Sequence, residues 1–251
     1  NAALRILTST QISTTTISSP IAAILSKMQE NEQHAAIQRK CLIKLAEMAF
    51  TNENYQETIA AVGGVTAILS TMDNHSSNAD VQHYGCAALL NLVVNGNNQV
   101  AIAKAGCITA ILSAMEAHSS NAYVQHYGCG ALFSLAGNHD NNRVTIAEEG
   151  GITLILSAMK THSSNFFAQE AGCRALIVLS SNNDNNKVTI AEAEGITTIL
   201  SAMKTHSFNS KVQYLCCVAL LNLADNNENN KVMIAAAGGI STVVFVMKKE
   251  V

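Results

Sequence analysis

The chain has 251 residues, a formal net charge of −3, and only 13% charged residues. This balance gives no general attraction to the phosphates of nucleic acids or to anionic membranes, so we expect no nucleic-acid partner. Hydrophobic residues make up 48% of the chain, but no apolar run is long enough for direct membrane insertion.

The main feature of the sequence is a short unit of text that recurs along the whole chain. The string Ile-Leu-Ser-x-Met ends at Met28, Met72, Met115, Met159 and Met203, and a degenerate copy ends at Met247. Successive copies are 43 or 44 residues apart. A period in this range is typical of a solenoid, in which each unit packs only against its neighbours.

The first 19 residues depart from this unit. Residues 1–7 match the end of the longest helix predicted in each later unit, and residues 8–19 are rich in Ser and Thr, which are poor helix formers. We therefore expect 1–19 to be a remnant of a preceding repeat plus a Ser/Thr-rich segment. Residues 20–251 are then an array of about five units with a period near 44 residues, the last of them incomplete.

Within one unit the apolar pattern predicts three helices. An apolar helix over 108–115 is followed by a polar turn at 118–121, which suits the N-cap of the next helix. Apolar and small residues then recur at helical spacing over 124–135, and a short helix is expected over 144–149. The pair Gly150-Gly151 closes the unit, because glycine adopts the positive φ of a sharp turn.

The seven cysteines follow the repeat and alternate with Gly and Ala. Equivalent positions in stacked helices are about 10 Å apart, and disulfides need Cα atoms within about 7 Å. We interpret them as buried free thiols, typical of the reducing cytoplasm or nucleus.

The recurring text resembles the armadillo repeat. The resemblance lies in the string N-N-x-V-x-I-A-x-x-G-G-I-x-x-I-L-S-x-M and in the later V-Q-x-x-G-C-x-A-L-x-N-L-A, and it covers nearly the whole chain. It implies an all-α fold, a right-handed α-solenoid (superhelix) of three-helix repeats. The third helices, expected over 81–92, 124–135, 168–179 and 212–223 and at an earlier position in the first repeat, would line a concave groove.

The resemblance also implies which residues face that groove. In peptide-binding relatives the third helix carries Trp four residues before Asn. This chain has no Trp, and only Asn91 and Asn222 match the Asn, so binding of nuclear-localisation peptides is not expected. The predicted partner-binding residues are Arg39, Glu47, His83, Ala87, Asn91, His126, Gly130, Ser134, Glu170, Arg174, Val178, Tyr214, Val218 and Asn222.

Other residues suggest chemistry but have simpler interpretations. His75, His118, His162 and His206 recur once per repeat, just past a helix C-terminus where a ring can bond the last carbonyls. A metal site would need such ligands to converge on one ion, so we favour a structural role. Tyr84 and Tyr127 are open to two interpretations, groove contact or packing between repeats.

The sequence contains no catalytic, nucleotide-binding or metal-binding motif, and we expect no cofactor. The leading hypothesis is a non-enzymatic scaffold whose groove binds an extended peptide or helix of a partner protein. The alternative is an architectural subunit that packs through its ends or convex face in a larger assembly. The apolar 239–247 segment, with no third helix after it, favours this alternative. An enzyme is the third and least favoured hypothesis.

Overall fold

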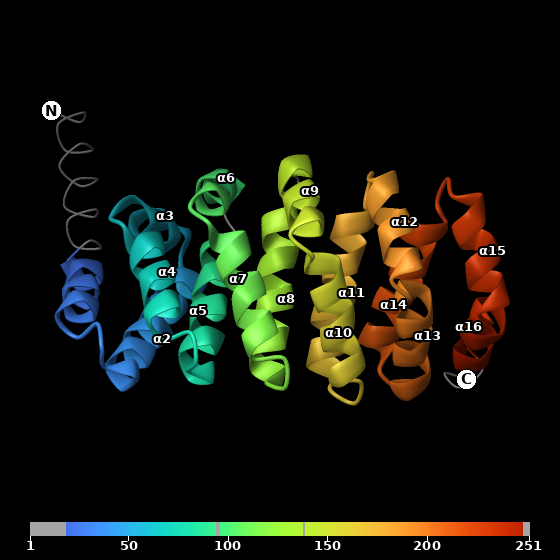
Figure 1. The fold of residues 1–251 in the computed structure, drawn as a ribbon, viewed down its shortest axis with the longest axis horizontal. Coiled ribbons are helices and arrows are strands. Elements are labelled where there is room, and N and C mark those ends of the chain that lie inside the picture. The colour runs from blue at the N-terminus through green and yellow to red at the C-terminus, as the bar shows by residue number, and fades with distance from the viewer. Residues whose placement is uncertain (1–18, 94–95, 138, 248–251) are drawn as a thin grey trace, which may run out of the picture. The chain divides into compact units, whose positions relative to one another are not determined.

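The computed structural model describes residues 19–93, 96–137 and 139–247, and the regular structure of these residues is helical throughout. Only residue 19 of the predicted 1–19 segment lies among them. The chain forms two compact units, Asn1–Ala110 and Ile111–Val251, and their boundary falls inside α7 (Cys107–Ala117). Figure 1 shows the helices of both units as ribbons.

The first unit contains a helix over 19–30 and five more helices. These are α2 (Ala35–Thr51), α3 (Glu53–Ala61), α4 (Gly64–Asn74), α5 (Ala79–Leu92) and α6 (Gly96–Lys104). The helix at 19–30 and α4 are second helices of a repeat, and α2 and α5 are third helices. The third helices pack directly against each other.

The second unit repeats this order. Its helices after α7 are α8 (Ala122–Ala136), α9 (Asp140–Glu148), α10 (Gly151–Thr161), α11 (Phe166–Ser180), α12 (Asp184–Glu192), α13 (Gly195–Thr205), α14 (Ser210–Ala224), α15 (Glu228–Ala236) and α16 (Gly239–Met247). The third helices are α8, α11 and α14, and α11 packs against the other two. The core between helices is formed by Leu, Ile, Val and Met side chains and by small residues.

The predicted boundaries are nearly right for second and third helices. First helices begin earlier than predicted: α9 starts at Asp140 rather than at residue 144. The polar residues predicted to be a loop form the first turn of α9 instead. In this turn the buried Asn142 Nδ2 donates to Leu135 O at 2.7 Å. This bond closes the end of the preceding third helix. As predicted, Asn121 caps α8, its Oδ1 accepting from Tyr123 N and Val124 N.

The two glycines of the pair Gly150-Gly151 have different structural roles. Gly150 has a φ of +84°, the left-handed conformation that the turn requires. Gly151 is needed for close approach, because a Cβ there would lie 2.5 Å from Ile146 Cγ2. Glu194 takes the left-handed position in the next repeat with a φ of +65°. Its carboxylate bonds Lys160 Nζ at 2.7 Å, and this contact lowers the pKa of the Glu194 carboxyl.

One buried glutamine per repeat joins the second helix to the third. Gln169 Nε2, on α11, donates to Met159 O at 2.8 Å and to His162 O at 3.0 Å, two carbonyls at the C-terminal end of α10. These carbonyls lie where a helix runs out of its own N–H donors. The same pair of bonds is made by Gln38, Gln82, Gln125 and Gln213.

Replacing Gln169 by Leu keeps an apolar stem but removes both donors. Each buried carbonyl left without a partner costs about 1–3 kcal/mol, so we expect Gln169→Leu to lower the free energy of unfolding by about 2–4 kcal/mol in urea titrations. Asn185→Ala removes an exposed amide on α12 and should cost less than about 0.5 kcal/mol. Equal costs for the two variants would show that the buried bonds contribute nothing.

Candidate functional site

The predicted partner-binding residues all lie on third helices. We call this surface, within each unit, the third-helix face. In the first unit it consists of Arg39 and Glu47 on α2 and of His83, Ala87 and Asn91 on α5. In the second unit it consists of His126, Gly130 and Ser134 on α8; Glu170, Arg174 and Val178 on α11; and Tyr214, Val218 and Asn222 on α14. All but one of these side chains or backbones are at least partly exposed. The exception is Ala87, which is buried in α5 and offers little surface to a partner.

In the first unit the charged and aromatic residues of this face contact one another. Arg39 Nη1 lies 4.0 Å from Asp80 Oδ2, and its guanidinium carbon lies 6.0 Å from the centre of the Tyr84 ring. His83 stacks on Tyr84 with ring centres 4.2 Å apart. Tyr84 therefore packs with predicted partner-binding residues of two adjacent repeats, Arg39 and His83. Glu47 is exposed and accepts a hydrogen bond from Lys44 Nζ at 2.9 Å.

In the second unit the largely buried carboxylate of Glu170 is the centre of a charged group. Its Oε1 lies 2.7 Å from Lys211 Nζ and 3.2 Å from Arg174 Nε. The Arg174 guanidinium carbon also lies 5.9 Å from the centre of the Phe133 ring. One carboxylate is thus held by two cations, and this stretch of the third-helix face presents no unpaired negative charge.

Next to this group lies an aromatic cluster, which we define as Tyr123, His126, Phe166 and Phe167. The His126 and Phe167 ring centres are 5.7 Å apart, and those of Phe166 and Phe167 are 3.9 Å apart. Tyr123 lies one turn before His126 on α8, so the two share a helix face. The exposed fractions are 66% for Tyr123, 40% for Phe166 and 51% for Phe167.

The sequence prediction missed a second row of residues on this face. It contains Asp80, Tyr123, Phe167 and Lys211, at the second position of α5, α8, α11 and α14 respectively. Three contacts across repeats join a predicted residue to the residue of this row 41 positions later: Arg39 to Asp80, His126 to Phe167, and Glu170 to Lys211. The signal was present in the sequence, because this row lies three residues before the predicted slot and therefore on the same helix face.

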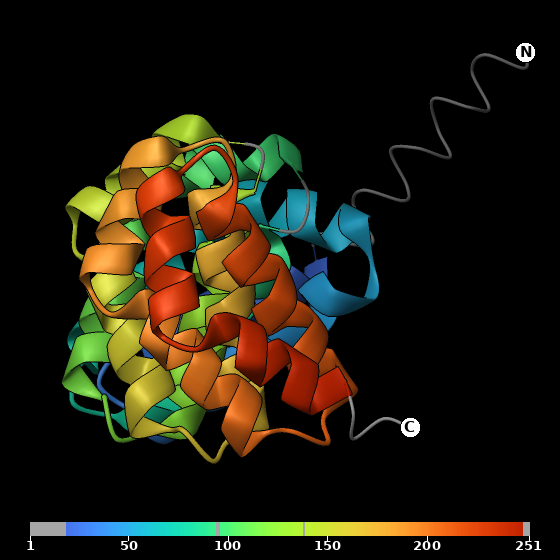
Figure 2. The same ribbon diagram turned by 90° about the vertical axis from the view of Figure 1, so that its right-hand side faces the viewer.

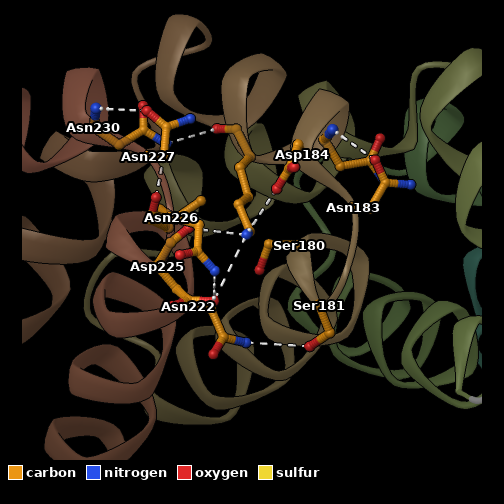
Figure 3. A network of polar contacts seen from close by, with 12 residues as sticks. Ser180, Ser181, Asn183, Asp184, Asn222, Asp225, Asn226, Asn227 and Asn230 are labelled. Carbon is orange, nitrogen blue, oxygen red and sulfur yellow. Dashed lines mark hydrogen bonds and ion pairs between the residues drawn. The ribbon is translucent and has the colours of Figure 1, made fainter.

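The two asparagines of the face are partly used within the protein. Asn91 Nδ2 donates to Ala46 O of α2 at 2.9 Å. Asn222 Nδ2 approaches Ser181 Oγ at 3.2 Å and Ile177 O at 3.3 Å, the first of which is drawn in Figure 3. A primary amide has two N–H donors and one oxygen acceptor, so Asn91 keeps more of its capacity for a partner than Asn222 does.

Buried cations fix the neighbouring loops. Lys187 Nζ bonds Asp184 Oδ1 at 2.9 Å and Asp225 O at 3.0 Å, which ties the start of α12 to the end of α14. Figure 3 shows Asp184 and Asp225 facing each other across this network. Arg143 makes the matching contacts with Asp140 Oδ1 at 2.6 Å and Ser181 O at 3.2 Å. These links hold consecutive third helices at a fixed separation.

The repeat supplies a matched pair of lysines to test this link. The Lys187 side chain is 5% exposed, whereas Lys231, in the same slot, is 49% exposed and bonds Glu228 on its own helix. We expect Lys187→Met to lower the free energy of unfolding by about 1–3 kcal/mol, because it removes the bonds of a buried ammonium to Asp184 Oδ1 and Asp225 O. Lys231→Met should cost less than about 0.5 kcal/mol in the same denaturant titration. Equal effects would refute the inter-repeat role of Lys187.

Three histidines of the predicted row make structural hydrogen bonds, but with carbonyls other than those predicted. His75, His162 and His206 sit at the C-termini of second helices as predicted. Their Nε2 atoms bond a carbonyl of the preceding repeat's turn, at 2.7–2.8 Å from Glu32, Ser119 and Ser163, and not the carbonyls of their own helix. Among the described residues no three His, Cys, Asp or Glu side chains are grouped to hold a metal ion.

The cysteines are free, and six of the seven are buried, while Cys217 is half-buried. Burial raises the pKa of Cys86 and of Cys107 to about 12, so both are neutral thiols at physiological pH. Cys173 and Cys216 occupy adjacent slots, and their sulfurs lie 3.5 Å apart in a hydrogen bond that raises the Cys216 pKa.

Comparisons with known proteins agree with this geometry. The family model described as the LRRK2 ARM repeat matches residues 17–250. The chain belongs to this armadillo repeat family. A comparison with curated proteins gives no match.

Solved structures show the same fold. One engineered protein shares 23% identity with this armadillo chain, with 89% of this chain and 87% of that one covered and a TM-score of 0.78. A second engineered protein gives 21% identity, 88% coverage of both chains and a TM-score of 0.78. A designed armadillo repeat protein in complex with the peptide (KR)4 gives 14% identity, 92% and 91% coverage and a TM-score of 0.76. The armadillo chain is therefore an α-solenoid of three-helix repeats. No helix among its described residues has the length and apolar character needed to span a membrane.

Proposed function

We propose that this armadillo protein is a non-enzymatic scaffold whose third-helix face binds an extended segment or a helix of another protein. The observation that carries the proposal is the aromatic cluster, since contiguous exposed apolar side chains on a soluble fold mark interaction sites. The designed neighbour solved with a peptide offers a precedent for the fold. Partner contacts would be supplied by the predicted residues of the face, with Asn91 bonding the partner's backbone.

The remaining chemistry of the face fits a binding surface better than a reaction centre. Its ionisable side chains form pairs or lie on rings, as Glu170 does with Lys211 and Arg174. Catalytic acids and bases need a group whose proton or lone pair is presented to a substrate. Tyr, His and Asn on a rigid helical framework are instead suited to adaptable contacts.

The test is capture of partners from the native source by the wild-type chain and by a variant in which Asn91, His126 and Arg174 are all replaced by Ala. We expect the variant to lose the captured partner, because it removes a backbone contact, part of the aromatic cluster and a cation. Glu148→Ala with Glu192→Ala, two exposed changes on the first helices α9 and α12, is the control and should capture normally. Capture by the triple variant at wild-type level, with its fold intact by circular dichroism, would contradict the proposal.

A second candidate is an architectural role through the face formed by α14, α15 and α16, which lies at the front of Figure 2. Ile240 is 70% exposed there, whereas the equivalent Ile196 and Ile152 are 2% and 1% exposed under the following repeat. Val244 is exposed in the same way, while the equivalent Leu200 is buried. This face therefore has the composition of an inter-repeat interface.

Light scattering after size-exclusion chromatography tests this second candidate. If the face associates, the chain should exceed its monomer mass of 26.5 kDa as concentration rises. Ile240→Asp should restore the monomer, because a carboxylate cannot be buried there without a partner. A monomer at every concentration would rule out self-association through this face.

A further inference from the structure

We propose that the aromatic cluster is the anchor point of the third-helix face and that it takes an apolar side chain, aromatic or aliphatic, from an uncharged stretch of the partner protein. The inference rests on the function proposed above and names the partner's chemistry at one place on that surface.

The cluster is exposed and also held in place. His126 Nδ1 lies 3.1 Å from Phe167 O, and because a carbonyl only accepts, Nδ1 carries the proton and donates. This bond joins α8 to α11 at the cluster, and the Phe166 and Phe167 rings pack on each other beside it. A partner side chain would therefore meet rings that are already ordered, which lowers the entropic cost of binding.

The surrounding charges do not favour a charged partner. At equivalent positions of adjacent third helices, Arg39 pairs with Asp80 in the first unit, and Glu170 pairs with Lys211 in the second. The third pair of this kind, His126 and Phe167, is the uncharged one among these three. A cation or an anion in the partner would find neighbouring charges already neutralised, whereas an apolar side chain would cover exposed ring surface.

A partner arginine is the main competing occupant, because Arg39 and Arg174 already lie over Tyr84 and Phe133 on this face. Those arginines also have a carboxylate within reach, Asp80 and Glu170 respectively. Glu170, three residues after Phe167 on α11, is already paired with two cations. An exposed cation–π contact without a carboxylate stabilises less than burial of an apolar side chain against several rings.

Panning of random dodecapeptides displayed on phage against the full chain tests the inference. We expect the enriched peptides to share one aromatic or aliphatic position in an uncharged stretch. Synthetic copies should bind Phe167→Ser at least about tenfold more weakly than wild type, as expected for a central aromatic contact. Phe167→Ser keeps the backbone carbonyl that His126 bonds, so the hydrogen bond that holds the cluster in place is retained.

Phe50→Ser is the control, since Phe50 is even more exposed than Phe167, at 78% against 51%, but lies at the opposite end of a third helix. It should change the affinity by less than about twofold. Enrichment of basic or acidic peptides, equal binding to Phe167→Ser, or no enrichment would overturn the inference. The scaffold proposal would survive each of these results if the triple variant still lost its captured native partner.

Discussion

The fold depends on the buried amide that each third helix sends to the end of the second helix before it. A helix leaves its last carbonyls without N–H partners, and here these carbonyls lie in the interior of a repeat, away from water. The side chains of Gln82, Gln125 and Gln169 supply the missing donors. Asn142, Asn186 and Asn230 do the same for the ends of the third helices. The helix ends at these junctions therefore have side-chain partners for carbonyls that lack N–H donors of their own helix.

The links between repeats determine which side chains meet on the third-helix face. The links between repeats use backbone carbonyls on one side, as with Lys187 and Asp225, or with His162 and Ser119. Such contacts place successive third helices in a constant register, so that a residue and the one 41 positions later meet repeatedly along the face. What differs from step to step is the chemistry of the pair, which is charged at Glu170–Lys211 and aromatic at His126–Phe167. A surface with fixed spacing and variable side-chain chemistry is suited to selective binding of a partner.

The sequence predicted the period, the three helices and the turn glycines, because these follow from local patterns that recur at every copy. It also predicted which slots of the third helix face a partner, and all of those residues except the buried Ala87 are at least partly exposed. It could not identify the partner of each side chain, since Glu170 and Lys211 are far apart in the chain and their contact depends on how two helices pack. The first turn of α9 was missed for a related reason: Asn142 looks like a loop residue until its bond to Leu135 O is seen. Glu194 is a third case, in which a residue other than glycine adopts the left-handed turn.

The central claim is that partners are bound by the third helices and not by α15 and α16 or by the other first helices. Hydrogen–deuterium exchange of the chain with and without its captured partner tests this most directly. The account predicts slower exchange in α8 and α11 when the partner is bound, with α9 and α12 unchanged. Protection confined to α15 and α16, or to the first helices, would contradict it.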